Sequence, residues 1–292
     1  MGKSVLITGC SEATIGNALA LEFARRGWTV FATARNTAKM ANLAGNSNIK
    51  LLALDIKDAK SVSAAREQIS IDQGGELDCL YHNAGVRSVS MAIEYDAEEQ
   101  KAIQAGGEEP YIRSDDVWMF EGNVIAVMAL TRAFSKLLIA AKGTVAITGS
   151  GSSRVHVPTS ATYNATKAAV EMYAKTLRLE LQPFGCHVVY VMTGAVATPM
   201  FYEQDMAFAS DSPYEPIVDK IKAGWNRAPG YTPSPPEEYA RGVVQEVTKP
   251  SPPKEVWCGK GVASLWWVEK LGLTWLLDGT FSRRYGLNSV IA

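Results

Sequence analysis

Two residues four positions apart, Tyr163 and Lys167, offer the clearest chemistry in this sequence. They stand in the segment 160–182, which is predicted to be a helix, so both side chains should project from one face, one turn apart. A phenol has an ordinary pKa of about 10 and is a poor acid or base at neutral pH, but an adjacent ammonium favours the phenolate. Lowering such a pKa by about three units takes about 4 kcal/mol. This pair could therefore protonate a carbonyl oxygen or deprotonate an alcohol.

Ser150 is a third candidate, because it ends the apolar run 143–150 that we predict to be a strand. Its hydroxyl could hydrogen-bond the same substrate oxygen. The Tyr-Lys spacing by itself is common by chance, and it equally fits a helix with Tyr163 in the core and Lys167 on the surface. The catalytic interpretation therefore depends on the rest of the chain.

The turn 9–16 is a candidate phosphate site, since it joins the β-branched run 4–8 to a predicted helix. Glycines at such a turn let a pyrophosphate approach the free N–H groups of the helix N-terminus. Gly9 and Gly16 are present, but Thr14 stands where glycine is usual. Its side chain could shift the loop, or its hydroxyl could bond a phosphate. A plain strand-to-helix turn in a protein that binds no nucleotide remains the alternative.

Strands and helices alternate along the chain, which predicts an α/β fold: a single Rossmann-type, doubly wound parallel sheet with helices on both faces. The strands are nearly all apolar, as expected when both faces of a sheet are covered. No internal repeat or linker interrupts them, so we expect residues 1–292 to form a single catalytic domain. The predicted strands are 4–8, 29–35, 49–56, 77–85, 143–150, 187–194 and 254–259, and the predicted helices are 16–27, 59–70, 117–141, 160–182 and 234–247, the last with Ser234 as N-cap and Pro235 first.

These stretches together resemble the short-chain dehydrogenase/reductase family, from residue 3 to about residue 200. The opening of the chain and the segment 281–287 look most like a fungal branch with acyl-dihydroxyacetone-phosphate reductases and natural-product ketoreductases of secondary metabolism. The resemblance implies an oxidoreductase in which Tyr163 is the acid or base and Lys167 supports it. It further implies that Ser150 positions the carbonyl and that Asn123 supports a proton path to Lys167.

The resemblance also implies a set of cofactor contacts. Asp55 would contact the adenine side, Thr198 the nicotinamide carboxamide, and Thr193-Gly194 replaces the family's Pro-Gly segment. The full set is Gly9, Ser11, Thr14, Ile15, Gly16, Arg35, Asp55, Ile56, Asn83, Ala84, Gly85, Tyr163, Lys167, Gly194, Val196 and Thr198.

The end of the second strand favours NADP(H) over NAD(H). An acidic residue there would bind the ribose 2′-OH of NAD, but the sequence has Ala34 followed by Arg35. A guanidinium suits a 2′-phosphate. Glu12 in the phosphate turn opposes this, because its carboxylate would repel that phosphate unless it points away.

Composition excludes several other functions. The 292 residues carry a net charge of −1, so we expect no nucleic-acid partner. His82, His156 and His187 lack ligand spacing, and we predict no metal. The four separated cysteines indicate reduced thiols, and no signal peptide or spanning helix is predicted. We expect a cytoplasmic homo-oligomer, a dimer or tetramer, and leave open a peripheral association with a membrane or lipid droplet.

The substrate is expected to be a small carbonyl compound or alcohol, and aromatics in the lid region 199–236 favour an apolar one. The acidic insertion 94–110 is expected to be a surface or rim loop. A different class of function is a Rossmann protein without redox turnover, either an NADP-sensing scaffold or an enzyme of cofactor-assisted rearrangement.

The apolar C-terminal extension 261–292 is open to three interpretations. Its large side chains recur at helical spacing and could pack on the domain or a sister subunit, lie on a membrane, or wall the substrate pocket. Glu269 and Asp278 beside Lys270 favour packing within a soluble protein, because a membrane helix should be strongly basic on its polar face. The stripe consists of Trp266, Trp267, Leu271, Trp275 and Leu276.

Overall fold

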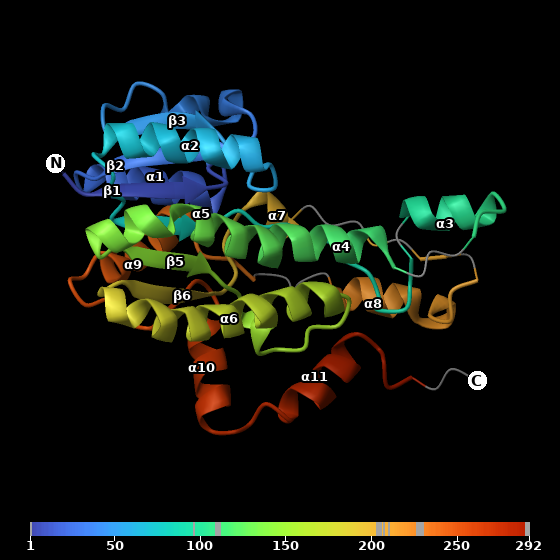
Figure 1. Ribbon diagram of the computed structural model, residues 1–292. Coiled ribbons are helices and arrows are strands. Elements are labelled where there is room, and N and C mark those ends of the chain that lie inside the picture. The colour runs from blue at the N-terminus through green and yellow to red at the C-terminus, as the bar shows by residue number, and fades with distance from the viewer. Residues whose placement is uncertain are drawn as a thin grey trace.

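The computed structural model describes residues 2–95, 97–108, 112–202, 206, 208–209, 211–225 and 231–289. Within these residues seven strands form one sheet in the order β3-β2-β1-β4-β5-β6-β7, with every neighbouring pair parallel (Figure 1). The winding direction reverses between β1 and β4, where ligands of such sheets bind. The strands are β1 Ser4–Thr8, β2 Thr29–Ala34, β3 Ile49–Ala53, β4 Cys79–His82, β5 Thr144–Thr148, β6 His187–Thr193 and β7 Glu255–Cys258.

Helices cover both faces of this sheet, as the alternating pattern predicts. One hydrophobic cluster joins the sheet to α1 and α9, and a second joins it to α2, α5 and α6. The strands supply both clusters: Val5 and Ile7 face the first, and Leu6 between them faces the second. The covering helices are α1 Ile15–Arg25, α9 Pro236–Val247, α2 Ala59–Asp72, α5 Ala126–Ala141 and α6 Ala161–Leu181.

The predicted helix 117–141 is longer and less regular than expected. It begins as α4 Ser114–Phe120, passes through a π-helical turn Glu121–Ile125, and continues as α5. By length and apolar composition the helix Ser114–Ala141 could span a membrane, since an 18-residue stretch of it has a mean hydropathy of 1.8. Its apolar side chains, Leu130 and Phe134 among them, pack into the second cluster, as in a core helix.

Of the short helices, α3 and α8 extend beyond the carboxyl ends of the strands (Figure 1). The insertion 94–110 is not simply a loop, as its described part contains the helix α3 and begins with a buried Glu94 that accepts a hydrogen bond from Ser212. Helix α9 begins at Pro236 rather than Pro235, because the backbone of Ser234 pairs with Ala195 and Ala197. The short helices are α3 Ala97–Gln104, α7 Pro199–Tyr202, α8 Val218–Trp225, α10 Val262–Lys270 and α11 Leu276–Arg284.

The C-terminal extension is two helices, so the predicted single stripe is wrong. Helix α10 ends at Lys270, and Gly272 then adopts a left-handed φ of 66° that no helix continues. Trp267 lies on α10, whereas Trp275 lies in the turn before α11. Both helices lie below α6 in Figure 1.

Candidate functional site

A cavity of about 740 Å³ lies at the carboxyl ends of the strands. Its walls come from loops spread over the whole chain, which the parallel sheet brings to one edge. Two of the predicted site residues, Gly16 and Asn123, do not line this cavity. The others all line it: Gly9, Ser11, Thr14, Ile15, Arg35, Asp55, Ile56, Asn83, Ala84, Gly85, Ser150, Tyr163, Lys167, Gly194, Val196 and Thr198.

Tyr163 and Lys167 share one face of α6, in its first turns. Tyr163 is 9% exposed and Lys167 is 6% exposed, so both are largely shielded from water. The Lys167 ammonium donates to the Thr148 carbonyl at the end of β5, at 3.0 Å. It lies 5.7 Å from the centre of the Tyr163 ring. The strand end therefore fixes the ammonium beside the phenol.

Ser150 begins a tight loop that is fastened to α6. Its hydroxyl oxygen accepts from the Ser152 amide at 3.1 Å, and the loop continues as the 3₁₀ turn Gly151–Ser153. The Ser153 hydroxyl donates to Glu171 of α6 at 2.5 Å. Glu171 also accepts two hydrogen bonds from the guanidinium of Arg154. These contacts set the position of Ser150 relative to Tyr163.

Asn123 lies in the π-helical turn, a feature that often marks functional sites. Its side-chain oxygen accepts from the Val86 amide and its nitrogen donates to the Val86 carbonyl, both at 2.8 Å. The Asn123 side chain thus holds the backbone of the segment that follows β4, and it does not line the cavity. A Cβ added at Gly85 would lie 3.2 Å from the Asn123 side-chain oxygen and 3.8 Å from the Lys167 nitrogen, so the two residues are near neighbours.

The turn 9–16 requires glycine at the two positions where the sequence has it, Gly9 and Gly16. Gly9 has a left-handed φ of 76°, and a Cβ at Gly16 would lie only 2.3 Å from the Gly9 carbonyl oxygen. Ala13 also adopts a left-handed φ, of 62°, which costs a non-glycine residue about 1 kcal/mol. The Thr14 hydroxyl donates to the Ser11 carbonyl at 2.6 Å and accepts from the Asn17 amide, so it caps α1. That hydroxyl is committed within the turn and is not directed to a phosphate.

Asn83 ties the ends of three strands together. Its side-chain nitrogen donates to the carbonyl of Thr8, the last residue of β1, at 3.0 Å, and its side-chain oxygen accepts from Thr148 of β5. The Thr8 hydroxyl in turn accepts from the backbone amides of Asn83 and Ala84. This network holds the reversal point of the sheet rigid, and this is where a dinucleotide would cross it.

The charges at the end of β2 match a phosphate. Arg35 and Ala34 line the cavity, whereas Glu12 is exposed and does not. The Glu12 amide is held by the Lys39 carbonyl at 2.7 Å. The opposition that the sequence raised between these charges is therefore reduced, and the residues present fit a 2′-phosphorylated dinucleotide.

Several lining residues escaped the sequence reasoning. Arg87, two residues after Gly85, places its guanidinium 5.2 Å from the Tyr163 ring centre and 4.5 Å from that of Trp225. Its place after the fourth strand was the only signal available. The C-terminal extension also lines the cavity with its inner side, which is one of the three interpretations that the sequence left open. The large apolar members of the wall are Trp118, Met200, Phe201, Trp225, Tyr231, Leu265, Phe281 and Tyr285.

His82 does not line the cavity. His82 is buried, and burial lowers its pKa to about 3 while its ring nitrogen lies 2.9 Å from the Thr131 hydroxyl. Across the described ranges no group of three or more His, Cys, Asp or Glu side chains could hold a metal ion.

Comparisons with known proteins agree with this geometry. The family model described as short chain dehydrogenase matches residues 3–207. A short-chain dehydrogenase/reductase of Pestalotiopsis microspora is 34% identical, covering 99% of this chain and 96% of its own. An NADPH-dependent 1-acyldihydroxyacetone phosphate reductase of Schizosaccharomyces pombe is 35% identical, covering 88% and 86% respectively. A crystal structure of a short-chain dehydrogenase from Streptomyces avermitilis matches with a TM-score of 0.74 at 23% identity, covering 99% and 100%.

Proposed function

Because this chain belongs to the short-chain dehydrogenase family, we propose that it is an NADPH-dependent reductase of a bulky, apolar ketone or aldehyde. The reverse oxidation of the alcohol uses the same groups. The observation that carries the proposal is the shielded Tyr163–Lys167 pair at the cavity wall beside Ser150. A protein that only binds a nucleotide gains nothing from a phenol held next to an ammonium.

In this reaction Tyr163 is the proton donor to the carbonyl oxygen. When bound, NADPH would supply the hydride. The Lys167 ammonium stabilises the phenolate that remains, and its orientation is fixed by the Thr148 carbonyl. Ser150 donates a hydrogen bond to the same carbonyl oxygen and so orients the substrate. The proton is then restored along a path beside Gly85, where Lys167 and Asn123 are neighbours.

Cofactor choice rests on Arg35 and on the residues around it. We propose that the Arg35 guanidinium pairs with the 2′-phosphate, because Arg35 lines the cavity and Glu12 does not. The names of two fungal relatives, in Schizosaccharomyces pombe and Saccharomyces cerevisiae, state NADPH dependence, which supports the same choice.

Substrate class is inferred from the remaining wall. Its aromatic side chains come from α4, α7, α8 and α11, and they favour a large apolar body next to the reacting carbonyl. Part of the expected lid, at 203–205, 207, 210 and 226–230, lies outside the described residues.

Replacing Tyr163 by Phe tests the proposal directly. We expect kcat for NADPH oxidation with a responsive ketone to fall by about a hundredfold or more, since the proton donor is lost. NADPH affinity should change by less than about twofold, which is under about 0.5 kcal/mol. Fluorescence titration and steady-state kinetics measure the two quantities.

The matched control is Tyr173→Phe, because Tyr173 lies on the same helix and does not line the cavity. Retention of more than a few per cent of kcat by Tyr163→Phe would refute its role. A protein that binds NADPH but oxidises it with no member of a ketone panel would instead favour the scaffold function.

A further inference from the structure

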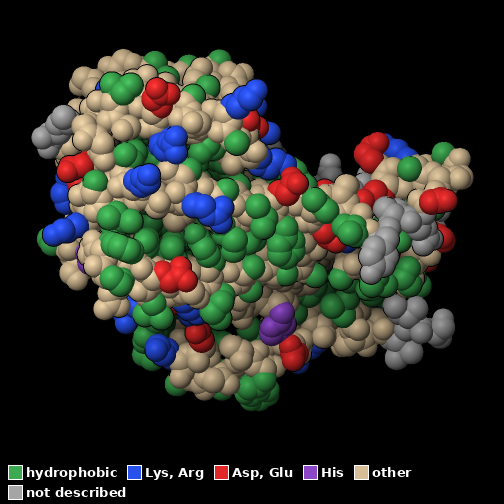
Figure 2. Space-filling model, viewed as in Figure 1, with side chains coloured by type: hydrophobic (Ala, Val, Ile, Leu, Met, Phe, Trp, Pro, Cys, Tyr) green, Lys and Arg blue, Asp and Glu red, His purple; other side chains and the backbone are tan. Residues whose placement is uncertain are grey.

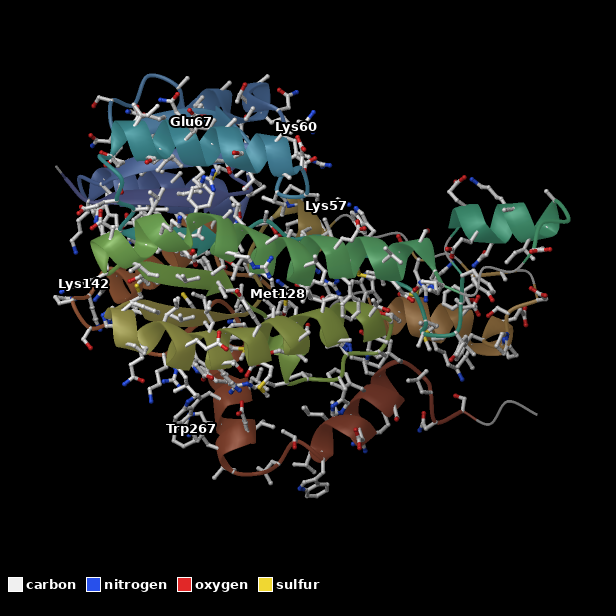
Figure 3. All side chains as sticks on the ribbon, in the orientation of Figure 1. Lys57, Lys60, Glu67, Met128, Lys142 and Trp267 are labelled. Carbon is white, nitrogen blue, oxygen red and sulfur yellow. The ribbon has the colours of Figure 1, made fainter. Side chains whose placement is uncertain are left out.

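The outer surface of the C-terminal helices is strongly apolar. Four large side chains are exposed there: Trp267 by 59%, Leu271 by 62%, Trp275 by 65% and Leu276 by 45%. We call this set the tail patch. Figure 3 shows Trp267 on the side of α10 that points away from α11, and Figure 2 shows hydrophobic side chains at the lower edge of the molecule. The inner side of the same helices, with Leu265 and Phe281, lines the cavity.

Each of the two acidic residues of this region has a basic partner on the body of the protein. Glu269 accepts two hydrogen bonds from one nitrogen of Arg154, at 2.7 and 2.8 Å. Asp278 lies 2.6 Å from a ring nitrogen of His156. The sequence suggests that both carboxylates lie on the polar face. In the structure Arg154 pairs with Glu269, whereas the Asp278 side chain remains 75% exposed beside His156.

The cations remain on the outside. Lys270 is exposed beside Trp266, with its nitrogen 5.6 Å from the ring centre. Lys260 and Arg283 are also exposed, and no carboxylate of the described residues forms an ion pair with either. Exposed tryptophan and leucine flanked by lysine and arginine match the interface of a bilayer, where indoles lie at headgroup depth and cations meet anionic lipids.

We propose that the tail patch docks on the surface of an anionic lipid bilayer. Trp267 and Trp275 enter the interface, and Lys260, Lys270 and Arg283 contact the headgroups. The Arg154–Glu269 and His156–Asp278 pairs hold both helices to the body during docking. Trp267, Trp275, Lys270 and Arg283 do not line the cavity, unlike Lys260, so docking by these four residues does not depend on the reaction proposed above.

Vesicle flotation with the full-length protein tests the proposal. The protein should float with vesicles of phosphatidylcholine and phosphatidylserine, and binding should weaken at high salt or with phosphatidylcholine alone. Combined Trp267→Glu and Trp275→Glu should reduce binding at least tenfold. Ile71→Glu is the matched control, because Ile71 is a 71% exposed apolar residue on α2.

Folding and mass are measured on the same samples. The melting temperature and the NADPH affinity should be unchanged in both variants. Loss of vesicle binding can then not be caused by misfolding. Absence of flotation by the unmodified protein would overturn the proposal, as would unchanged flotation of the double variant. A lower mass in gel filtration for the double variant, without a change in flotation, would mean that a second copy of the chain covers the patch.

Discussion

The proposed selectivity for NADPH over NADH rests on very few side chains. The second strand ends in Ala34 and Arg35, and the nearest carboxylate in the phosphate turn, Glu12, stays outside the cavity. A guanidinium at this point gains a charge-assisted hydrogen bond only when the ribose carries a phosphate. The same residue gives no comparable contact to a 2′-hydroxyl.

Replacing Arg35 by Ala should therefore act on one cofactor only. In the unmodified protein NADPH should bind at least about tenfold tighter than NADH, a difference of about 1.4 kcal/mol. The substitution should weaken NADPH binding and leave NADH binding nearly unchanged. Titrations of both cofactors measure this, with Arg66→Ala on α2 as a control cation outside the cavity. Equal affinities in the unmodified protein would refute the assignment.

Between elements, one ion-pair cluster joins the loop that follows Ser150 to α6, β7 and α10. Arg154 follows the Ser150 loop and pairs with Glu171 of α6, Glu255 of β7 and Glu269 of α10. Burial by itself raises the pKa of the Glu171 carboxyl, but hydrogen bonds from Arg154 and its neighbours outweigh burial and hold that pKa below its ordinary value. The Glu171 carboxyl is therefore ionised at neutral pH, and its ion pair with Arg154 positions the loop.

Glu171→Gln should loosen that loop. We expect unfolding at pH 7 to become easier by about 1–3 kcal/mol, because Arg154 loses its most buried partner. Since the folded-state pKa of Glu171 is lowered, its contribution is present above the unfolded value of about 4.3 and is lost as the pH falls below it. The stabilities of variant and unmodified protein should therefore converge in acid. Urea unfolding at pH 7 and in acid measures this, and an equal difference at both would contradict it.

Local sequence patterns predicted most of the strands and helices around the sheet. They failed where contacts between residues far apart in the sequence determine the structure. The β-branched runs predicted all seven strands, and nearly all of the predicted motif residues lie in the cavity wall. The helix α3 was missed because its sequence is polar and acidic, and the burial of Glu94 depends on Ser212 far along the chain. Arg87 and Phe281 reach the cavity through tertiary packing, for which no local pattern exists.

The molecule as a whole closes one cavity from both ends of its sequence. The cavity is bordered by the phosphate turn after β1, the ends of β2 and β3, and the Tyr163–Lys167 pair of α6. The inner sides of α10 and α11 border it as well. A ligand that fills the cavity must therefore couple the N-terminal half of the sheet to the C-terminal extension. Binding to the folded state alone stabilises it by mass action.

Hydrogen exchange with and without ligands should reveal this coupling in two steps. NADPH at about a hundred times its dissociation constant should stabilise the protein by about 2.7 kcal/mol, raising the melting temperature by roughly 5 °C. It should slow exchange in the turn 9–16 and after β2 and β3, because the cofactor contacts expected from Gly9, Arg35 and Asp55 lie there. Adding a bulky apolar ketone should then slow exchange in residues 262–285, where Phe281 and Tyr285 border the cavity. A small polar ketone serves as the control and should protect the extension less, since it cannot reach that wall. Equal protection by both ketones, or none in the extension, would mean that α10 and α11 do not contact the substrate.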